Sequence, residues 1–126
     1  MTANAIRQLM CRKRRQIGCG AQQKAAYRLS RQIQASRFYQ RSQHIACYWA
    51  VNGEIDLRFL IKKAWKQGKS CYLPVIRGEH MSFKRYLPGM RLQKNRFGIP
   101  EPVAGQVIAI HSLDLVLTPL AAFDKH

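Results

Sequence analysis

Hydrophobic residues near the amino end of the chain recur at helical spacing. Residues 4–17 bring four of them close to one face of a helix: Ile6, Leu9, Met10 and Ile17. Gly18 and Gly20 follow, and this helix is expected to stop there because glycine commonly ends helices. A second helix is predicted over residues 21–36, with three apolar side chains facing inward: Ala26, Leu29 and Ile33.

The pattern then changes to a continuous apolar run over residues 44–51, which is typical of a strand covered on both faces. Asn52 and Gly53 predict a turn after it, and Asp56 is suited to cap the start of a third helix. This helix has a regular apolar face made of Leu57, Leu60, Ile61, Ala64 and Trp65. Gly68 is expected to end it.

Three further segments predict strands: residues 70–76, residues 81–86 as an outer strand, and residues 113–117. Residues 87–102 are rich in proline and glycine and are expected to form a loop. Strand, helix and strand at this spacing form a β-α-β unit, which implies a parallel sheet with helices packed on it. Ligands of such sheets gather at the carboxyl ends of the strands, so one candidate site is expected at three segments: residues 52–54, 74–77 and 119–124.

The composition fits a single folded domain, since 126 residues with 47% hydrophobic content can build a core. No apolar run approaches the roughly 18 residues of a membrane span, and the first 20 residues lack the apolar centre of a secretory signal. A cytoplasmic location is therefore expected. The four cysteines form no C-x-x-C pair and are expected to be reduced, with Cys47 and Cys71 in the core.

The chain is strongly basic, with a formal net charge of +16 and no acidic residue before Glu54. Such a field attracts polyanions or small multiply charged ligands, although a solvated surface without a specific partner has the same composition. The Arg-Lys-Arg-Arg run at residues 12–15 makes a basic nucleic-acid-binding module the alternative function. Aromatic residues that could stack on bases are sparse in the same region.

Common catalytic motifs are absent from the sequence. It contains neither G-x-G-x-x-G nor G-x-x-x-x-G-K-[ST], the two usual phosphate loops, and no G-x-S-x-G. The four histidines lack metal-ligand spacing, so no metal-binding residue is predicted. Residue patterns alone lead to a basic α/β domain with an anion site.

Five segments, taken in order, nevertheless resemble one family. They are Gly-Glu-Ile-Asp at 53–56, Tyr-Leu-Pro at 72–74, Met-Ser-Phe at 81–83, Phe-Gly-Ile-Pro-Glu-Pro at 97–102, and Leu-Asp-Leu-Val-Leu-Thr-Pro-Leu-Ala-Ala-Phe-Asp at 113–124. Over nearly its whole length the chain is similar to 5-formyltetrahydrofolate cyclo-ligases, also called methenyltetrahydrofolate synthetases. The resemblance implies a three-layer α/β/α fold with a mostly parallel, Rossmann-like sheet (NagB/RpiA/CoA transferase-like).

The resemblance also implies a reaction that uses ATP and Mg²⁺. ATP phosphorylates the formyl oxygen of 5-formyltetrahydrofolate (folinate), the neighbouring folate nitrogen attacks the activated carbon, and phosphate leaves. The products are 5,10-methenyltetrahydrofolate, ADP and phosphate. Protein groups contribute to such phosphoryl transfer mainly by positioning the reactants and neutralising charge.

Two charged residues acquire roles from the resemblance. Arg7 matches the arginine of the family's K-x-x-L-R signature and is expected to bind ATP phosphates, because a guanidinium grips oxygens as a fork. Ala3 stands where that signature has lysine, which weakens the expected nucleotide grip. Glu54 matches the substrate-binding glutamate, whose carboxylate can accept hydrogen bonds from the amino-pyrimidine edge of the pterin. The alternatives are a solvated helix arginine and an exposed acid after a turn.

Three apolar residues are expected at the folate pocket on the same grounds. Trp49 offers a broad indole face to a flat ring, although a buried strand aromatic explains it equally well. Met81 and Phe83 fall near the same pocket, and ordinary core positions are the alternative for both.

Asp124 ends the Phe-Asp pair that precedes the family's phosphate loop, and it is expected near the site. Residues 1–126 are expected to form a single cyclo-ligase domain without its C-terminal third, which includes the loop R-L-G-x-G-x-G-Y-Y-D. The chain alone is therefore expected to have little activity and to aggregate readily. A non-catalytic remnant that assembles with another chain is a third interpretation.

Overall fold

The computed structural model describes residues 2, 4–6, 8–9, 19–51 and 53–119. Residues 4–6 and 8–9 are helical, in agreement with the first predicted helix. The elements that follow are α2 (Cys19–Ala35), α3 (Arg37–Arg41), β1 (His44–Ala46), α4 (Arg58–Lys66), β2 (Ser70–Arg77), β3 (His80–Tyr86), β4 (Leu92–Lys94), β5 (Pro100–Pro102), β6 (Val107–Ile108), the 3₁₀ helix η1 (Ile110–Ser112) and β7 (Leu115–Val116).

Five strands form the main sheet in the order β6-β3-β2-β1-β7. Strand β1 is parallel to both of its neighbours, β2 and β7. Strand β3 is antiparallel to β2 and to β6. The expected α/β class is confirmed, but the sheet is mixed rather than mostly parallel. A tight turn joins β2 directly to β3, and such a connection can only produce antiparallel neighbours.

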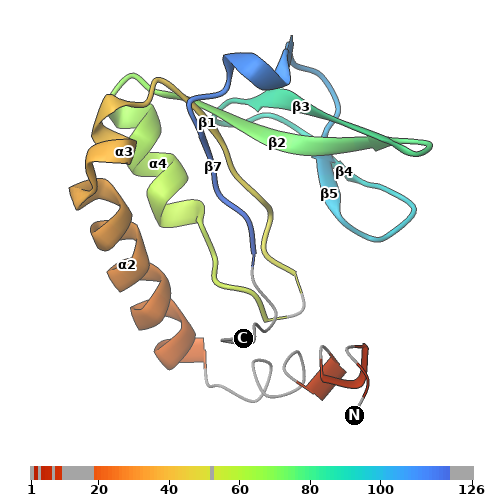
Figure 1. The fold of residues 1–126 in the computed structure, drawn as a ribbon, viewed down its shortest axis with the longest axis horizontal. Coiled ribbons are helices and arrows are strands. Elements are labelled where there is room, and N and C mark those ends of the chain that lie inside the picture. The colour runs from red at the N-terminus through yellow and green to blue at the C-terminus, as the bar shows by residue number, and fades with distance from the viewer. Residues whose placement is uncertain (1, 3, 7, 10–18, 52, 120–126) are drawn as a thin grey trace.

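The helices α2, α3 and α4 stand together on one side of the sheet (Figure 1). Their main core cluster joins helix and strand residues: Tyr39, Ile45, Cys47, Leu57, Leu60, Ile61, Ala64, Cys71 and Leu73. Side chains alternate between the faces of a strand, so Ala46, Tyr72 and Phe83 point to the opposite face and form a second cluster. Ile108 and Leu113, which flank η1, pack on this cluster, so a short connecting segment covers it in the described residues.

Buried thiols lie in the main cluster. Cys47 and Cys71 are free and buried, as expected from the apolar runs that contain them. A hydrogen bond with the Cys71 thiol, together with burial, raises the pKa of Cys47. Burial also raises the pKa of Tyr39 to about 12, and its hydroxyl donates to Gln67 Oε1. Cys47 and Tyr39 are therefore uncharged at neutral pH and act as core residues.

The second predicted helix, residues 21–36, corresponds to α2, and Ser36 separates it from the short helix α3. The Ser36 hydroxyl donates to Ile33 O (2.8 Å) and accepts the N–H of Tyr39 (3.2 Å). Serine is a favoured helix N-cap because its oxygen replaces a missing backbone acceptor. It therefore starts α3 as a separate short helix that turns away from α2.

The first predicted strand is shorter than its apolar run. Only His44–Ala46 is strand, although the chain from 47 to 51 stays buried or half-buried. Cys47 N–H still donates to Tyr72 O (2.8 Å), and no backbone hydrogen bond to a neighbouring strand follows it in the described residues. The apolar run therefore predicted the burial of these residues correctly, but the strand pairing ends before the run does.

The predicted loop over residues 87–102 contains a hairpin, β4 and β5, and that prediction was wrong. Asn95 N–H donates to Ile99 O (2.9 Å) and Val103 N–H donates to Arg91 O (3.2 Å). Because backbone groups alternate in direction along a strand, the N–H groups of residues 100 and 102 would point away from β4. Proline at both positions therefore costs the pair no hydrogen bond.

Candidate functional site

A pocket of about 250 Å³ lies between the amino-terminal half of α2 and the segment that joins β1 to α4. We call it the Glu54 pocket. Its lining residues are Ala21, Gln22, Gln23, Ala25, Ala26, Gly53, Glu54, Ile55, Asp56, Arg58 and Phe59. The segment after β1 was expected to carry part of the site, so this is the pocket to which sequence reasoning led.

A tight turn presents Glu54 to this pocket. Gly53 has φ of 76°, a left-handed conformation that glycine adopts without strain. Glu54 N–H donates to Val51 O (3.1 Å), and Glu54 Oε1 accepts the N–H of Val51 (3.0 Å). Oε2 has no hydrogen-bond or ion-pair partner among the residues that the structure describes, so one carboxylate oxygen is available to a ligand.

Asp56 fixes the other end of the same segment. Its Oδ1 accepts the N–H of Arg58 (2.8 Å), the first residue of α4, although the N-cap position is held by Leu57 and not by Asp56 as predicted. Its Oδ2 lies 2.6 Å from Arg58 Nη2 in an ion pair. The hydrogen bond to Asp56 raises the pKa of Arg58, so this guanidinium stays charged beside the pocket.

Trp49 lies behind Arg58 and does not line the Glu54 pocket. The Arg58 guanidinium carbon is 5.8 Å from the centre of the Trp49 ring, a cation-π contact. The other side of the indole meets Tyr86 edge to face, with ring centres 6.2 Å apart. Trp49 is half-buried and packs against the main core cluster, so its ring links that core to the charged segment after β1.

Met81 and Phe83 lie on β3, on the face of the sheet opposite α2 and α4. Phe83 is buried with Ala46 and Tyr72, which is the core position given as its alternative. Met81 is two residues away on the same face, pairs with Ile76 across the strands and is 55% exposed. Neither residue lines the Glu54 pocket.

Two sequence-predicted residues, Arg7 and Asp124, fall outside the described residues, as does Ala3. The expected convergence of Arg7 with Glu54 therefore stays a prediction. No three His, Cys, Asp or Glu side chains gather as potential metal ligands in the part of the chain that the structure describes. No described helix is both long and apolar enough to cross a bilayer.

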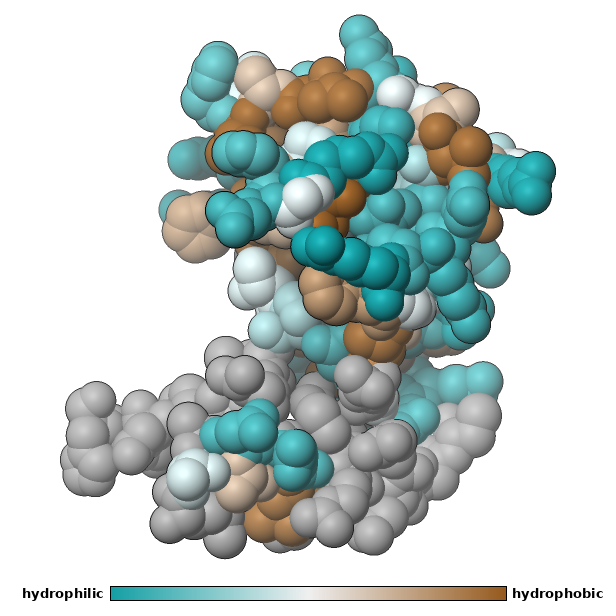
Figure 2. Space-filling model, turned by 90° about the vertical axis from the view of Figure 1, so that its right-hand side faces the viewer, coloured by the Kyte–Doolittle hydropathy of each residue, from teal (hydrophilic) through white to brown (hydrophobic). Residues whose placement is uncertain are grey.

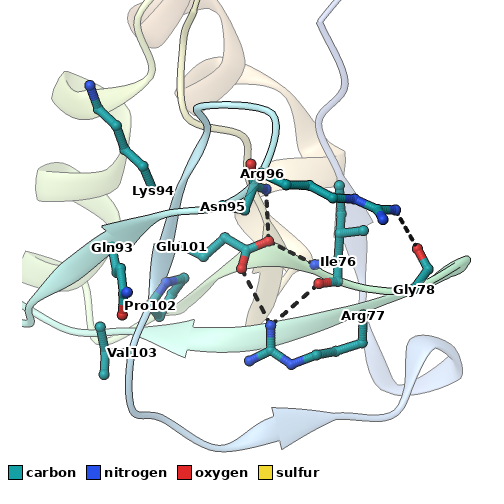
Figure 3. Close-up of a pocket in the computed structure, with 10 residues that line it drawn as sticks. All are labelled: Ile76, Arg77, Gly78, Gln93, Lys94, Asn95, Arg96, Glu101, Pro102 and Val103. Carbon is teal, nitrogen blue, oxygen red and sulfur yellow. Dashed lines mark hydrogen bonds and ion pairs between the residues drawn. The ribbon is translucent and has the colours of Figure 1, made fainter.

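Sequence reasoning missed a second pocket, which we call the hairpin pocket. It has a volume of about 380 Å³ and lies between the end of β2 and the β4–β5 hairpin (Figure 3). Its lining residues are Ile76, Arg77, Gly78, Gln93, Lys94, Asn95, Arg96, Glu101, Pro102 and Val103. Residues 76–77 were expected to join one site with Glu54, but the two pockets share no lining residue. The Pro-Glu-Pro sequence at residues 100–102 forms one strand of this hairpin, but its prolines led to the prediction of a loop.

Comparison with known sequences decides the family. The sequence model of the 5-formyltetrahydrofolate cyclo-ligase family matches residues 2–126. The chain belongs to this family. A cyclo-ligase from Haemophilus influenzae is 40% identical over 90 residues, which cover 68% of this chain and 48% of that protein. The Escherichia coli K12 cyclo-ligase is 36% identical over 87 residues, covering 65% of this chain and 48% of that protein.

Solved cyclo-ligase-family structures share the fold. The 5,10-methenyltetrahydrofolate synthetase of Aquifex aeolicus aligns with a TM-score of 0.85 at 26% identity, over 98% of this chain and 63% of that one. A synthetase from Mycoplasma pneumoniae aligns with a TM-score of 0.74 at 16% identity, over 99% of this chain and 68% of that one. The chain spans about half the length of the curated cyclo-ligases it matches.

Proposed function

We propose that this chain binds 5-formyltetrahydrofolate and ATP for the cyclisation that gives 5,10-methenyltetrahydrofolate, ADP and phosphate. The observation that carries the proposal is Glu54, which by resemblance matches the family's substrate-binding glutamate and lines a pocket, with no partner for Oε2 among the described residues. In the reaction the formyl oxygen takes the γ-phosphoryl group of ATP. The neighbouring folate nitrogen then attacks the formyl carbon, loses its proton, and the carbon–oxygen bond to the leaving phosphate breaks.

Glu54 is proposed to recognise the amino-pyrimidine edge of the pterin. Such an edge offers N–H donors, and an ionised carboxylate has acceptor positions on both oxygens. The Val51 N–H holds Oε1 at 3.0 Å, which fixes the carboxylate while Oε2 faces a ligand. Holding the group in place before binding lowers the entropy lost when the ligand arrives.

The apolar residues are proposed to act at different distances from the ligand. Trp49 holds Arg58 from the core side and is proposed to support the Glu54 pocket from behind. Met81 is exposed and Phe83 is buried on the opposite face of the sheet, so they are proposed to act on a part of the ligand outside this pocket. This proposal refines the expectation that all three line the pocket.

Nucleotide binding is proposed to depend on Arg7, with Mg²⁺ held largely by the phosphates. Mg²⁺ commonly keeps water and binds through substrate phosphates with one or two carboxylates, so it needs no protein cage of three ligands. Asp124 is proposed to lie near this part of the site. The free thiols Cys47 and Cys71 support a reducing compartment such as the cytoplasm. No comparison favours the nucleic-acid-binding alternative.

Binding of folinate to the Glu54→Gln variant tests the proposal. Glutamine keeps the shape and can still accept the Val51 N–H, but its amide nitrogen cannot accept a hydrogen bond from the pterin. We expect folinate affinity, measured by titration calorimetry, to fall about tenfold or more, because hydrogen bonds to charged groups are strong. Glu79→Gln, in the exposed β2–β3 turn, is the matched control and should bind within about twofold of the unmodified chain. Equal affinity in both variants would refute the role of Glu54.

A further inference from the structure

The hairpin pocket is lined by three cations and a single acid. Arg77, Lys94 and Arg96 contribute the positive charges, and Glu101 contributes the carboxylate. A second acid, Glu79, is only two residues from Arg77, but it is exposed in the β2–β3 turn and does not line the pocket. The molecular face that carries this turn and the hairpin is largely hydrophilic (Figure 2). Local charge therefore favours an anionic ligand.

The one acid of the pocket is committed to holding the structure together. Glu101 is 7% exposed, and its Oε2 accepts the N–H of Ile76 (2.7 Å) and the Nδ2 group of Asn95 (2.9 Å). Its Oε1 lies 3.6 Å from Arg77 Nη1. Figure 3 shows these contacts converging on Glu101 from β2 and from the hairpin. This carboxylate joins the walls of the pocket and has little capacity left for a cationic ligand.

The loop at the tip of the hairpin is also fixed internally. Asn95 Oδ1 accepts the N–H groups of Phe97 (2.8 Å) and Ile99 (3.1 Å). Arg96 crosses from this loop to the β2–β3 turn, where its Nη2 donates to Gly78 O (2.9 Å). Since these amides are occupied, the charged side chains of Arg77, Lys94 and Arg96 supply the donors for a ligand.

Both arginines keep donors for a ligand. An arginine side chain has five N–H donors, and the contacts of Arg77 and Arg96 use only part of them. Arg77 is 67% exposed, and the Arg96 guanidinium is held 4.8 Å above the Phe97 ring. The Lys94 ammonium points away from the Glu101 contacts (Figure 3). Both arginines line the same pocket.

We propose that Arg77 and Arg96 form a subsite for a multivalent oxyanion, either a chain of carboxylates or a phosphate group. Guanidinium groups bind both kinds of oxyanion through paired hydrogen bonds, so the arginines alone do not separate the two sources. The subsite lies outside the Glu54 pocket and does not require the proposed role of Glu54.

Titration calorimetry at low salt tests the subsite, because salt screens exposed charges. Three probes separate the sources: inorganic phosphate, ATP and a triglutamate peptide. The test variant is Arg77→Gln with Arg96→Gln. The control is Arg37→Gln with Arg41→Gln, which removes the same charge from exposed positions of α3. We expect the test variant to bind at least one probe about tenfold more weakly and the control to stay within about twofold.

The pattern across the probes identifies the ligand source. Selective loss of triglutamate binding assigns the subsite to a carboxylate chain, whereas selective loss of phosphate or ATP binding assigns it to phosphate. Glu54→Gln should leave the affinities for these three probes unchanged, because Glu54 does not line the hairpin pocket. The two proposals can therefore fail independently of each other. Equal losses in the test and control variants, or no binding of any probe, would overturn the proposal.

Discussion

Glu54 follows strand β1 and Glu101 lies within strand β5, and the two carboxylates are used in opposite ways. Glu101 is buried, and both of its oxygens have partners: Ile76, Asn95 and Arg77. Glu54 is half-buried, and among the described residues only its Oε1 accepts a hydrogen bond, from a residue three positions earlier. One glutamate joins distant segments, whereas the other is held locally with an oxygen exposed to a pocket.

The contrast shows how burial and partners distinguish a structural acid from the acid proposed to bind a ligand. Burying a carboxylate is costly unless its oxygens have partners, so Glu101 can be buried only because its oxygens are paired. A half-buried carboxylate with an unused oxygen keeps the desolvation cost low and can exchange water for a ligand. Both glutamates belong to family-like motifs, so the motifs alone could not separate their roles.

The largest effect is expected from Glu101→Ala. This substitution leaves the Ile76 N–H and the Asn95 amide without their acceptor in a part-buried region. We expect the free energy of unfolding, measured by urea denaturation, to fall by about 3 kcal/mol. Glu101→Gln should lose less, because its amide oxygen can still accept one of these hydrogen bonds. A loss below about 0.5 kcal/mol for the alanine variant would show that Glu101 is not structural.

A smaller effect on stability is expected from Glu54→Ala. The substitution removes one hydrogen bond within a tight turn, and the Val51 N–H it releases is only partly buried. The free energy of unfolding should fall by less than about 1 kcal/mol in the same urea experiment. If Glu54→Ala destabilises the chain as strongly as Glu101→Ala, the distinction between the two glutamates fails.

Sequence patterns predicted the part of the fold where local periodicity and burial agree. The helix from residue 57, the strand over residues 70–76 and the parallel pairing of β1 with β2 all follow from apolar spacing. The same spacing did not predict the short helix α3, which begins after the N-cap residue Ser36. Nor could it show that Pro100 and Pro102 occupy strand positions whose N–H groups are not needed.

Among the predicted site residues that the structure describes, only Glu54 lines one of the two pockets, and its role stays a prediction. Glu54 came from the family resemblance and lies in a pocket. Trp49 and Phe83 came from the same resemblance, yet their packing depends on partners distant in sequence, such as Tyr86 and Tyr72. The hairpin pocket was missed because Glu101 meets Ile76 across 25 residues, a contact that no local pattern encodes.

Asp114 extends the comparison to an exposed carboxylate that joins distant segments. Its Oδ2 accepts the N–H groups of His44 and Gln43, at 2.9 Å each, and these hydrogen bonds lower the pKa of Asp114. A lowered folded-state pKa means that the contribution to stability is present above the ordinary aspartate value of about 4. It is lost as the pH falls through the folded-state value.

Asp114→Asn should therefore produce the smallest effect, visible as a change in pH dependence. Asparagine cannot ionise, so unfolding midpoints in urea for the variant and the unmodified chain should differ at neutral pH and converge as the pH falls below about 4. Glu79→Asn, at an exposed turn position, is the control and should leave the acid limb of the stability curve nearly unchanged. A constant difference across the whole pH range would mean that shape, rather than charge, makes Asp114 useful. In that case Asp114 would not count as a structural carboxylate of the kind that Glu101 represents.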